Sequence, residues 1–334
     1  MKKVILLFLM IFIQCGCTNV MNNTNGEINV LNWTSYIPQE VIDDFEREYA
    51  IKVNYGTYSS NEELLAKISS SKPGTYDVIF PSDYMVELMI KKDMLMPIDK
   101  YKLTNYSNIN SLFLGQKFDY KNEYSLPFLA ATTVIAVNRD NIKDKIEGYN
   151  DLLKEKYQND IVLLDDQRIV IGMGLEACGY KMNETDINKI NKSKEWLLKM
   201  NKNVKAFDSD SPKTFLITNE TNIGIMWNAE AIIAKEYNPN IEIIYPKEGF
   251  AISLDNYTIV KGAKNIENSY KFINYLLRDD VNKKITNEYP YLNTTYANMN
   301  LDYEELKMVL NKASFVENIG HSISNYDKIW AQIK

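Results

Sequence analysis

Five short segments of the chain are rich in aromatic, hydroxyl, amide and carboxyl groups. They are residues 32–36 (Asn-Trp-Thr-Ser-Tyr), 81–84 (Pro-Ser-Asp-Tyr), 165–166 (Asp-Asp), 226–228 (Met-Trp-Asn) and 254–257 (Leu-Asp-Asn-Tyr). Such groups hold an aliphatic ammonium ion, because ring faces attract the cation and cover its methylenes, while carboxylates and hydroxyls accept its N–H hydrogen bonds. The segments point to recognition of a small amine. For any single segment, the alternative is an aromatic residue that only caps the core.

The groups that hydrolytic catalysis usually needs are scarce. The sequence has a single histidine, His321, and contains no G-x-S-x-G, Walker or H-E-x-x-H motif. Asp165 and Asp166 are the best candidates for paired carboxylates, but adjacent residues of an extended strand point to opposite faces. We therefore expect no enzymatic activity and no cofactor, and we expect His321 to be a surface or packing residue.

The N-terminus reads as an export signal. A basic start and an apolar run at residues 4–13 are followed by Cys15 and Cys17. The run is shorter than the roughly 20 apolar residues that span a bilayer. A cysteine at this exit is typical of lipoproteins, and Cys17 is preferred over Cys15 as the lipidated residue; an ordinary signal peptide with incidental cysteines is the alternative. We expect a signal peptide at 1–16 and a flexible, Asn- and Thr-rich tether at 17–26.

The bulk composition excludes several classes of partner. The formal net charge is −6, and loss of the basic start makes it more negative, which disfavours nucleic acid and anionic membrane surfaces. After removal of the leader only Cys178 remains besides the anchor, so we expect no intrachain disulfide and no cysteine-based metal site. A chain of 334 residues exceeds the size at which one core usually keeps growing, so two lobes are expected.

Strand and helix patterns alternate along the chain. Apolar and β-branched runs predict strands at residues 27–33, 51–57, 76–80, 132–137, 161–164, 222–226, 241–245 and 257–260. Helical periodicity predicts helices that open at Pro38 and after Ser60, and later ones at 188–200 and 268–277. This alternation specifies a mostly parallel sheet covered by helices, with ligands at the carboxyl ends of its strands. The five polar segments all fall where a predicted strand gives way to a loop.

Five longer runs carry a resemblance to a known family. They are N-W-T-S-Y-I-P at 32–38, Y-D-V-I-F-P-S-D-Y at 76–84, L-T-N-Y-S-N at 103–108, G-I-M-W-N at 224–228 and Y-P-K-E-G at 245–249. From about Ile28 to the C-terminus the chain resembles the spermidine/putrescine-binding proteins of bacterial ABC importers. The resemblance implies an α/β, two-lobed fold like that of type II periplasmic binding proteins. Two or three strands would cross between discontinuous lobes, with the ligand cleft between them.

The resemblance also implies how the chain is divided and with what it works. The first lobe is expected at 27–131 and 256–300, and the second at 132–255 and 301–334. The implied ligand is a polyamine, putrescine or spermidine or both, which is delivered to a permease that works with an ATPase. The protein is expected to be a monomer on the periplasmic side of the envelope, held to a membrane by its lipid.

Position by position, the resemblance assigns ligand contacts of three kinds. The aromatic walls are Trp33, Tyr36, Tyr84, Trp227 and Tyr289, the hydroxyl contacts are Thr34, Ser82 and Ser209, and the amine-binding carboxylates are Asp166 and Asp255. Four contacts of the family are replaced: Ser35 and Ile169 stand where it has acids, Ser253 where it has a tryptophan and Val316 where it has a glutamine. A charge-assisted hydrogen bond contributes about 1.5–3 kcal/mol, so each missing carboxylate lowers affinity for the family's ligand roughly ten- to a hundredfold.

These replacements leave the identity of the ligand open. Asp83, Glu230 and Glu317 could supply the lost charge, although a solvated surface position is expected for each. We hypothesise that a shorter diamine, or a polyamine held in an altered register, is preferred to spermidine. Two other classes stay open. One is a receptor of this fold for another ligand, with paired tyrosines for an iron-carrying molecule or an arginine clamp for an amino acid; the other is a surface lipoprotein acting as an adhesin or sensor.

Overall fold

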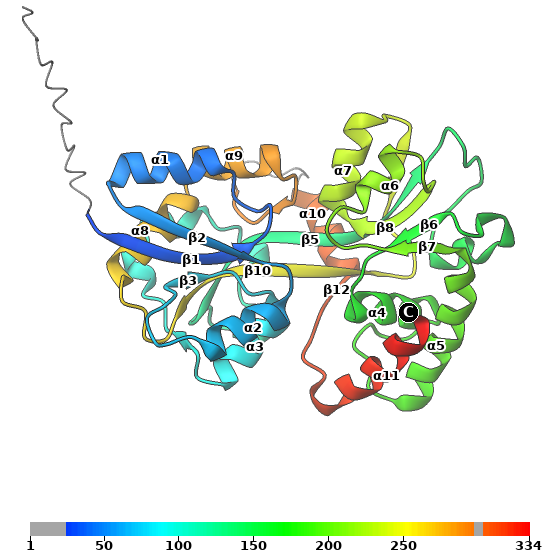
Figure 1. Cartoon of the computed structure of the whole chain (residues 1–334), viewed down its shortest axis with the longest axis horizontal. Coiled ribbons are helices and arrows are strands. Elements are labelled where there is room, and N and C mark those ends of the chain that lie inside the picture. The colour runs from blue at the N-terminus through cyan, green and yellow to red at the C-terminus, as the bar shows by residue number, and fades with distance from the viewer. Residues whose placement is uncertain (1–24, 297–302) are drawn as a thin grey trace, which may run out of the picture.

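The computed structural model describes residues 25–296 and 303–334, so the signal peptide, Cys15, Cys17 and most of the tether lie outside the described residues. Two α/β lobes lie side by side and are joined by long strands (Figure 1). Within the described ranges, no helix is long and apolar enough to cross a membrane.

The first part of the chain alternates strands and helices, as the sequence predicts. In order come β1 (Glu27–Trp33), α1 (Gln39–Tyr49), β2 (Lys52–Tyr58), α2 (Asn61–Ser70), β3 (Val78–Ile79), α3 (Asp83–Lys91), β4 (Leu95–Met96) and, after short 3₁₀ turns, β5 (Ser125–Asn138). The strand predicted at 76–80 is shorter, because the Asp77 carboxylate turns to the backbone N–H groups of Lys264 and Asn265 (both 3.0 Å) and Pro81 has no N–H.

The second part repeats the pattern and then returns to the first lobe. It contains β6 (Ile161–Leu163), α4 (Gln167–Ala177), α5 (Ile187–Met200), β7 (Val204–Phe207), α6 (Lys213–Ile217), β8 (Ile223–Trp227), α7 (Asn228–Tyr237) and β9 (Ile241–Ile244). The return and the C-terminal part comprise β10 (Phe250–Val260), α8 (Ile266–Leu276), α9 (Asp279–Glu288), β11 (Leu292–Asn293), α10 (Tyr303–Lys312), β12 (Ala313–Phe315) and α11 (Ile323–Ile333).

Two strands, β5 and β10, connect the lobes. The main path of the sheet runs β2-β1-β3-β10-β5-β8-β6-β7, with β1 parallel to β2 and β3, and β6 parallel to β7 and β8. The first half of β5 pairs antiparallel with β10 and its second half, from Thr133, with β8, so the predicted strand at 132–137 is only part of it. Pro127 is tolerated because the pairing skips Phe128 next to it, as in a β-bulge.

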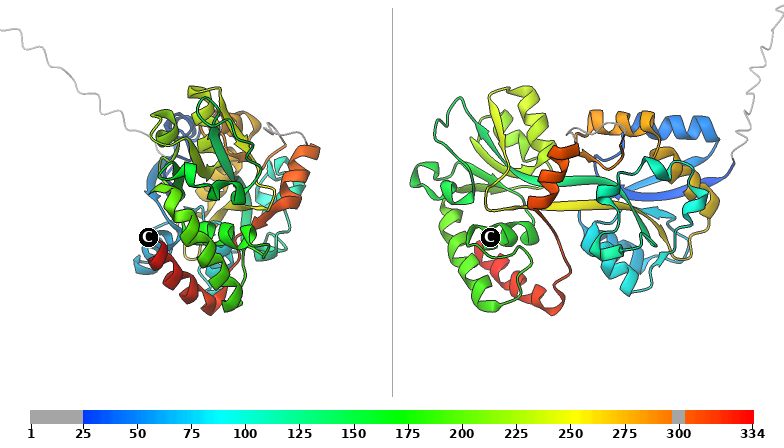
Figure 2. Two further views of the ribbon diagram at one scale, coloured as in Figure 1. Left: turned by 90° about the vertical axis from the view of Figure 1, so that its right-hand side faces the viewer. Right: turned by 180° about the vertical axis from the view of Figure 1, so that it is seen from behind.

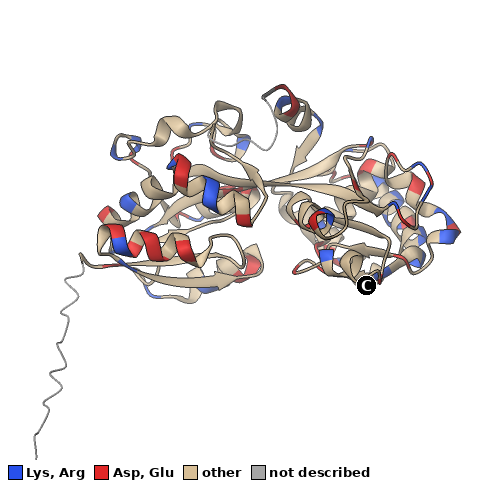
Figure 3. Cartoon of the chain, turned by 90° about the horizontal axis from the view of Figure 1, so that it is seen from above, with Lys and Arg blue, Asp and Glu red and all other residues tan. Residues whose placement is uncertain are grey.

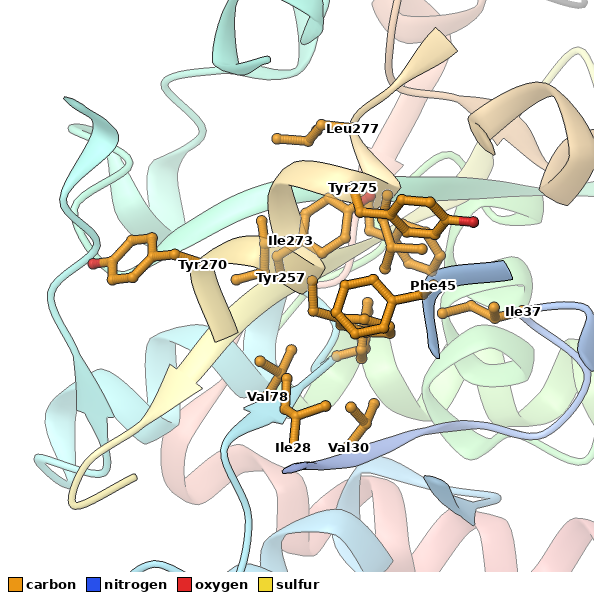
Figure 4. Close-up of a cluster of buried hydrophobic side chains, with 14 of the residues drawn as sticks. Ile28, Val30, Ile37, Phe45, Val78, Tyr257, Tyr270, Ile273, Tyr275 and Leu277 are labelled. Atoms are coloured by element: carbon orange, nitrogen blue, oxygen red, sulfur yellow. The ribbon is translucent and has the colours of Figure 1, made fainter. Parts of the chain in front are cut away.

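Each lobe has its own apolar core. Figure 4 shows the first, in which Ile28 of β1, Phe45 of α1 and Ile273 of α8 come together. The second core joins β5, β6, α4 and α5 to α11 at the C-terminus, through residues such as Ile329. Leu306 of α10 packs beside the crossing strands, where Figure 2 shows this helix. The cores combine segments distant in sequence, which rigidly places the strand ends between them.

Candidate functional site

The carboxylate of Asp255, in β10, is the centre of the candidate site. Its residue is 2% exposed, and it accepts a hydrogen bond from the Ser82 hydroxyl (Oγ to Oδ1, 2.6 Å). The register shifts between Asp255, which pairs with Leu129, and Asn256, which pairs with Pro127, and bulges of this kind re-aim side chains at functional sites. Burial raises the pKa of Asp255 to about 6, while donors on Ser82, Tyr36 and Trp33 oppose the shift. This buried carboxylate is still charged at neutral pH and is suited to a cationic partner.

A second buried carboxyl group, that of Asp83, lies beside it. Asp83 is 1% exposed, so the prediction of a solvated position is wrong. It accepts backbone hydrogen bonds from Tyr84 (2.8 Å) and Leu254 (3.4 Å). Burial, together with the neighbouring Asp255, raises the pKa of Asp83 well above its ordinary value, against the opposing charge of Arg168. Two carboxylates this close do not both ionise readily, so we expect Asp83 to be neutral when Asp255 is charged.

The aromatic rings of the first lobe form one connected group next to Asp255. The Trp33 ring packs against Tyr58 with 4.6 Å between centroids, and its indole N–H donates to the Phe80 carbonyl at 2.9 Å. Tyr36 lies 6.2 Å from Trp33 and 4.7 Å from Tyr291, centroid to centroid. The end of β1 and the α9–β11 connection thus bring rings from distant segments to one wall.

Tyr291 is part of this wall although the sequence prediction names Tyr289. Tyr289 is partly buried, with its hydroxyl beside Ser35, while Tyr291 contacts Tyr36 directly. Burial raises the pKa of both Tyr36 and Tyr291, so these phenols stay neutral.

The predicted hydroxyl contacts differ in their settings. Ser82 is buried against Asp255, whereas Thr34 and Ser209 are exposed. The backbone N–H of Thr34 donates to the Tyr58 carbonyl at 3.3 Å, which holds the end of β1 in place. The structure thus joins Ser82 to the carboxylate centre and leaves Thr34 and Ser209 at the surface.

The second lobe contributes Asp166, which caps the N-terminus of α4. Its carboxylate accepts hydrogen bonds from the backbone N–H groups of Arg168 (2.8 Å) and Ile169 (3.1 Å), and burial raises its pKa. Asp165, the neighbouring acid, is exposed and pairs with Lys334 at 2.6 Å. The two aspartates therefore have separate settings and do not form a catalytic carboxylate pair.

Tyr84 links the lobes at this end of the cleft. Its hydroxyl donates to the Glu62 carboxylate of α2 at 3.1 Å. Burial, and after it the charges of Glu62 and Asp166, raise the pKa of Tyr84 well above its ordinary value, and the charge of Glu62 adds to the burial that raises the pKa of Asp166. The guanidinium of Arg168 lies 5.8 Å from the centre of the Tyr84 ring. Glu62 and Arg168 are absent from the predicted site: each sits in a helical pattern whose polar residues normally face solvent.

Arg168 is fixed by several partners in the second lobe. Its Nη2 donates to the Glu317 carbonyl (2.6 Å) and to the Asn183 side-chain oxygen (3.1 Å), and its guanidinium also lies 5.5 Å from the Tyr326 ring. The residue is 9% exposed, so its charge acts in a poorly solvated setting. Both hydrogen bonds are made by Nη2, whereas the buried Nε has no hydrogen-bond partner among the described residues, so the guanidinium is held in place with a donor still free.

An apolar wall replaces polar groups next to Arg168. Two of the departures from the family pattern, Ile169 and Val316, are 4% and 5% exposed and pack into one cluster. We call this cluster the apolar wall; Tyr84 and Trp227 lie against it, and its members are Leu164, Ile169, Met182, Ala251 and Val316. The two positions at which the resemblance implies polar contacts therefore belong to one apolar cluster.

The remaining candidate acids are engaged with lysines. Glu230 is not a solvated surface residue as predicted: its side chain is 12% exposed and pairs with Lys213 at 2.7 Å. Glu317, whose side chain is 44% exposed, pairs with Lys117 at 2.7 Å. Figure 3 shows Lys and Arg interspersed with Asp and Glu over both lobes. Among the described residues, no group of three or more His, Cys, Asp or Glu side chains could hold a metal ion.

Known proteins match both the sequence and the fold. A family model described as bacterial extracellular solute-binding protein matches residues 40–304. Over 330 residues the chain is 36% identical to the spermidine/putrescine-binding periplasmic protein of Salmonella typhimurium, which covers 96% of this chain and 94% of that protein.

Solved structures show the same architecture. The spermidine/putrescine ABC transporter substrate-binding protein of Streptococcus pneumoniae superposes with a TM-score of 0.80 at 30% identity, over 92% of this chain and 98% of that one. A lipoprotein of Treponema pallidum shares the fold with a TM-score of 0.83 at 24% identity, over 92% of this chain and 99% of that one. The predicted two-lobed, type II periplasmic-binding-protein fold is confirmed. The chain belongs to the bacterial extracellular solute-binding proteins, and among them to the group of the spermidine/putrescine-binding proteins.

Proposed function

We propose that this protein captures a polyamine in the cleft between its lobes and delivers it to a membrane permease driven by an ATPase. The observation that carries the proposal is the buried, negatively charged Asp255, held by Ser82 and adjoining the aromatic wall of Trp33, Tyr36 and Tyr291. An ammonium group would satisfy this carboxylate, and the rings would cover the methylenes. The names of the relatives, which bind spermidine and putrescine, support the same ligand class.

The other features of the proposal extend from this site. Asp166, Trp227 and Tyr84 would bind the ligand from the opposite side, with Thr34, Ser209 and Tyr289 at the edges. Binding would favour a closed form, because only that form lets both lobes contact the amine. The lobes would comprise 27–131 with 256–300, and 132–255 with 301–334, a division that the two separate cores support.

The protein is proposed to act as a receptor and not as an enzyme. We further propose that it is a monomer, exported to the extracytoplasmic side of the membrane and anchored there through lipidated Cys17. The cysteine at the exit of a short apolar run supports the anchor. Labelling with a radioactive fatty acid tests the anchor. Cys17→Ala should abolish incorporation of the label, whereas a variant that is still labelled would show that another residue carries the lipid.

The function is tested by calorimetric titration of the protein without its leader. Putrescine, cadaverine, spermidine and spermine are added in turn at pH 7, and at least one should bind with one-to-one stoichiometry. A thermal shift with the same amines provides an independent readout. Absence of heat and of thermal shift with all four would contradict the assignment.

Amine affinity is expected to depend on pH below neutrality. The ligand's ammonium groups stay protonated well above pH 7, like those of lysine, so the carboxylate is the group that titrates. Because the pKa of Asp255 is about 6, affinity should fall by up to tenfold per pH unit below that value as the carboxylate is neutralised. Titrations between pH 4.5 and 8 measure this dependence. Below the pKa of Asp255, on the order of one proton should be released for each amine bound.

The ligand-free protein should show the opposite trend. Its folded-state pKa for Asp255 lies above the ordinary value of 3.8, so this group favours folding most below that value and loses its contribution as pH rises through about 6. Burial raises the pKa of Glu176 to about 7, so this group titrates in nearly the same pH range as Asp255. Glu176→Gln is therefore the control, and it should leave the pH profile of amine affinity unchanged. A flat affinity profile would contradict the role of Asp255.

Replacement of Asp83 by asparagine is expected to change amine affinity by less than about threefold at pH 7. The amide matches the shape of the neutral carboxyl group and can still accept the backbone N–H groups of Tyr84 and Leu254. Calorimetry on Asp83→Asn and Asp255→Asn side by side tests the division of roles. Equal losses in the two variants would mean that both carboxyl groups carry charge in the complex.

A further inference from the structure

The groups around the cleft form two anchoring centres, each with negative charge that can hold an ammonium group. Beyond these centres lie the apolar wall and the guanidinium of Arg168, which disfavour a further ammonium group. We propose that the site selects a dication, a short aliphatic diamine, over amines with three or four ammonium groups. The structural basis is the apolar wall together with the anchored guanidinium of Arg168. This inference rests on the proposed function, because it specifies which member of the amine class is bound.

The first anchoring centre is the buried Asp255 with its donor Ser82. The second combines groups of both lobes: in the first lobe Glu62 accepts from the Tyr84 hydroxyl, and in the second lobe Asp166 caps α4 nearby. The centres belong to different elements, one on β10 and one shared by α2 and α4. A molecule with an ammonium group at each end of an alkyl chain can neutralise both at once.

The charge of the cleft matches such a molecule. Counted as ionised, the carboxylates of Asp255, Asp166 and Glu62 exceed the single positive charge of Arg168 by two. Burial raises the pKa of Asp166, and a bound ammonium group would favour its ionised form. Asp83 adds none, since it is expected to be neutral beside Asp255. Glu230 is likewise compensated, by Lys213. A third ammonium group would bring positive charge in excess of what the described part of the cleft can neutralise.

The apolar wall gives that third group no hydrogen-bond acceptor. Ile169 and Val316 present only hydrocarbon, and an ammonium group moved against them loses water without a replacement partner. Arg168 adds electrostatic repulsion, because its position is fixed by the Glu317 carbonyl and Asn183. The wall thus limits the length of the ligand as well as its charge.

A cavity of about 130 Å³ next to the wall does not provide another route. It is lined by Tyr84 and Val316, and its acidic residues are Glu87 and Glu317. Glu87 pairs with Lys91, and Glu317 with Lys117 at 2.7 Å, so both carboxylates have cationic partners. An ammonium group that entered would have to displace a lysine.

The wild-type protein tests the inference without any substitution. Calorimetric titrations at pH 7 with putrescine, cadaverine and spermidine should give at least about tenfold tighter binding of one of the diamines than of spermidine, the effect of one unmatched charged hydrogen bond. Spermidine binding as tightly as or more tightly than both diamines would overturn the inference and leave the polyamine function intact. Absence of binding by every amine would instead contradict the proposed function.

A gain-of-charge variant tests the cause. Ile169→Glu places a carboxylate in the wall and should move the ratio of diamine to spermidine affinities at least about tenfold toward spermidine. The matched control is Ile187→Glu, which adds the same acid at a 45% exposed position at the start of α5 and should leave the ratio unchanged. Because Ile169 is buried, Val316→Gln is made in parallel and should shift the ratio the same way by a smaller factor. Circular dichroism establishes that each variant is folded, and an unchanged ratio in a folded Ile169→Glu protein would overturn the role of the wall.

Discussion

Asparagine in place of Asp255 is expected to lower amine affinity at pH 7 by about a hundredfold or more. The change removes one partner of a buried ion pair, and such a loss costs about 3–5 kcal/mol. The charge of the carboxylate has little access to water, since its residue is 2% exposed, and the donors around it, on Ser82, Tyr36 and Trp33, are uncharged. Calorimetric titration with putrescine gives the affinity directly.

The free Asp255→Asn protein should be at least as stable as the wild type. Burial raises the pKa of Asp255 to about 6, which means that the charged form is held at a cost in the empty protein at pH 7. Weak binding together with an unchanged or higher melting temperature would separate a ligand-binding role from a structural one. Asp165→Asn is the matched control, because that aspartate is exposed and pairs with Lys334; it should bind as the wild type does.

Alanine in place of Trp33 is expected to reduce amine affinity about thirtyfold or more. The indole ring would supply a desolvated cation–π contact of about 2 kcal/mol and, as part of the aromatic wall, would cover the methylenes. Its position is fixed by Tyr58 at 4.6 Å between centroids and by the hydrogen bond to the Phe80 carbonyl. Trp33→Phe should retain most of the affinity, because a ring face remains.

The control for the loss of a large ring is Trp330→Ala. Trp330 packs against Phe207 in the second lobe, with 5.4 Å between centroids, and takes no part in the candidate site. This variant should lose stability and keep the affinity of its folded fraction. If the two alanine variants weakened binding equally, the effect of Trp33 would lie in the fold and not in ligand contact.

Much of the site could be predicted because strand ends are visible in the sequence. Trp33 ends β1 and Trp227 ends β8, as the alternating and apolar patterns indicate. Parallel strands bring their carboxyl ends to one edge, so the segments after them are near neighbours without further information. The fold class could be predicted on the same basis. The full length of β5 could not, because Pro127 argues against a central strand and is accommodated only by the local bulge.

The features that sequence patterns missed depend on tertiary contacts. Asp83 is the first residue of α3, a position where an acid normally faces solvent, and it is buried because β10 passes over it at Leu254. Glu62 lies in the first turn of α2 and joins the site through its hydrogen bond with Tyr84. Ile169 and Val316 look like two separate losses in sequence, yet they pack together in one cluster. No local pattern reports contacts between segments so far apart.

The positions that differ from the family pattern fall into two groups. Ile169 lies in α4 and Val316 directly after β12, and both belong to the apolar wall. Ser253 lies on β10, two residues before Asp255, and Ser35 lies in the loop after β1. The first group can alter the choice among amines without touching Asp255, whereas the second group lies beside the proposed amine site itself.

A crystal structure of the protein in complex with putrescine tests the proposed role of Asp255 most directly. We expect one ammonium nitrogen at about 2.7–3.0 Å from a carboxylate oxygen of Asp255, with the alkyl chain between Trp33 and Trp227. A ligand bound elsewhere, for example in the charged surface pocket between α1 and α9 lined by Asp44 and Arg278, would contradict it. So would a complex in which Asp255 has no contact with the amine.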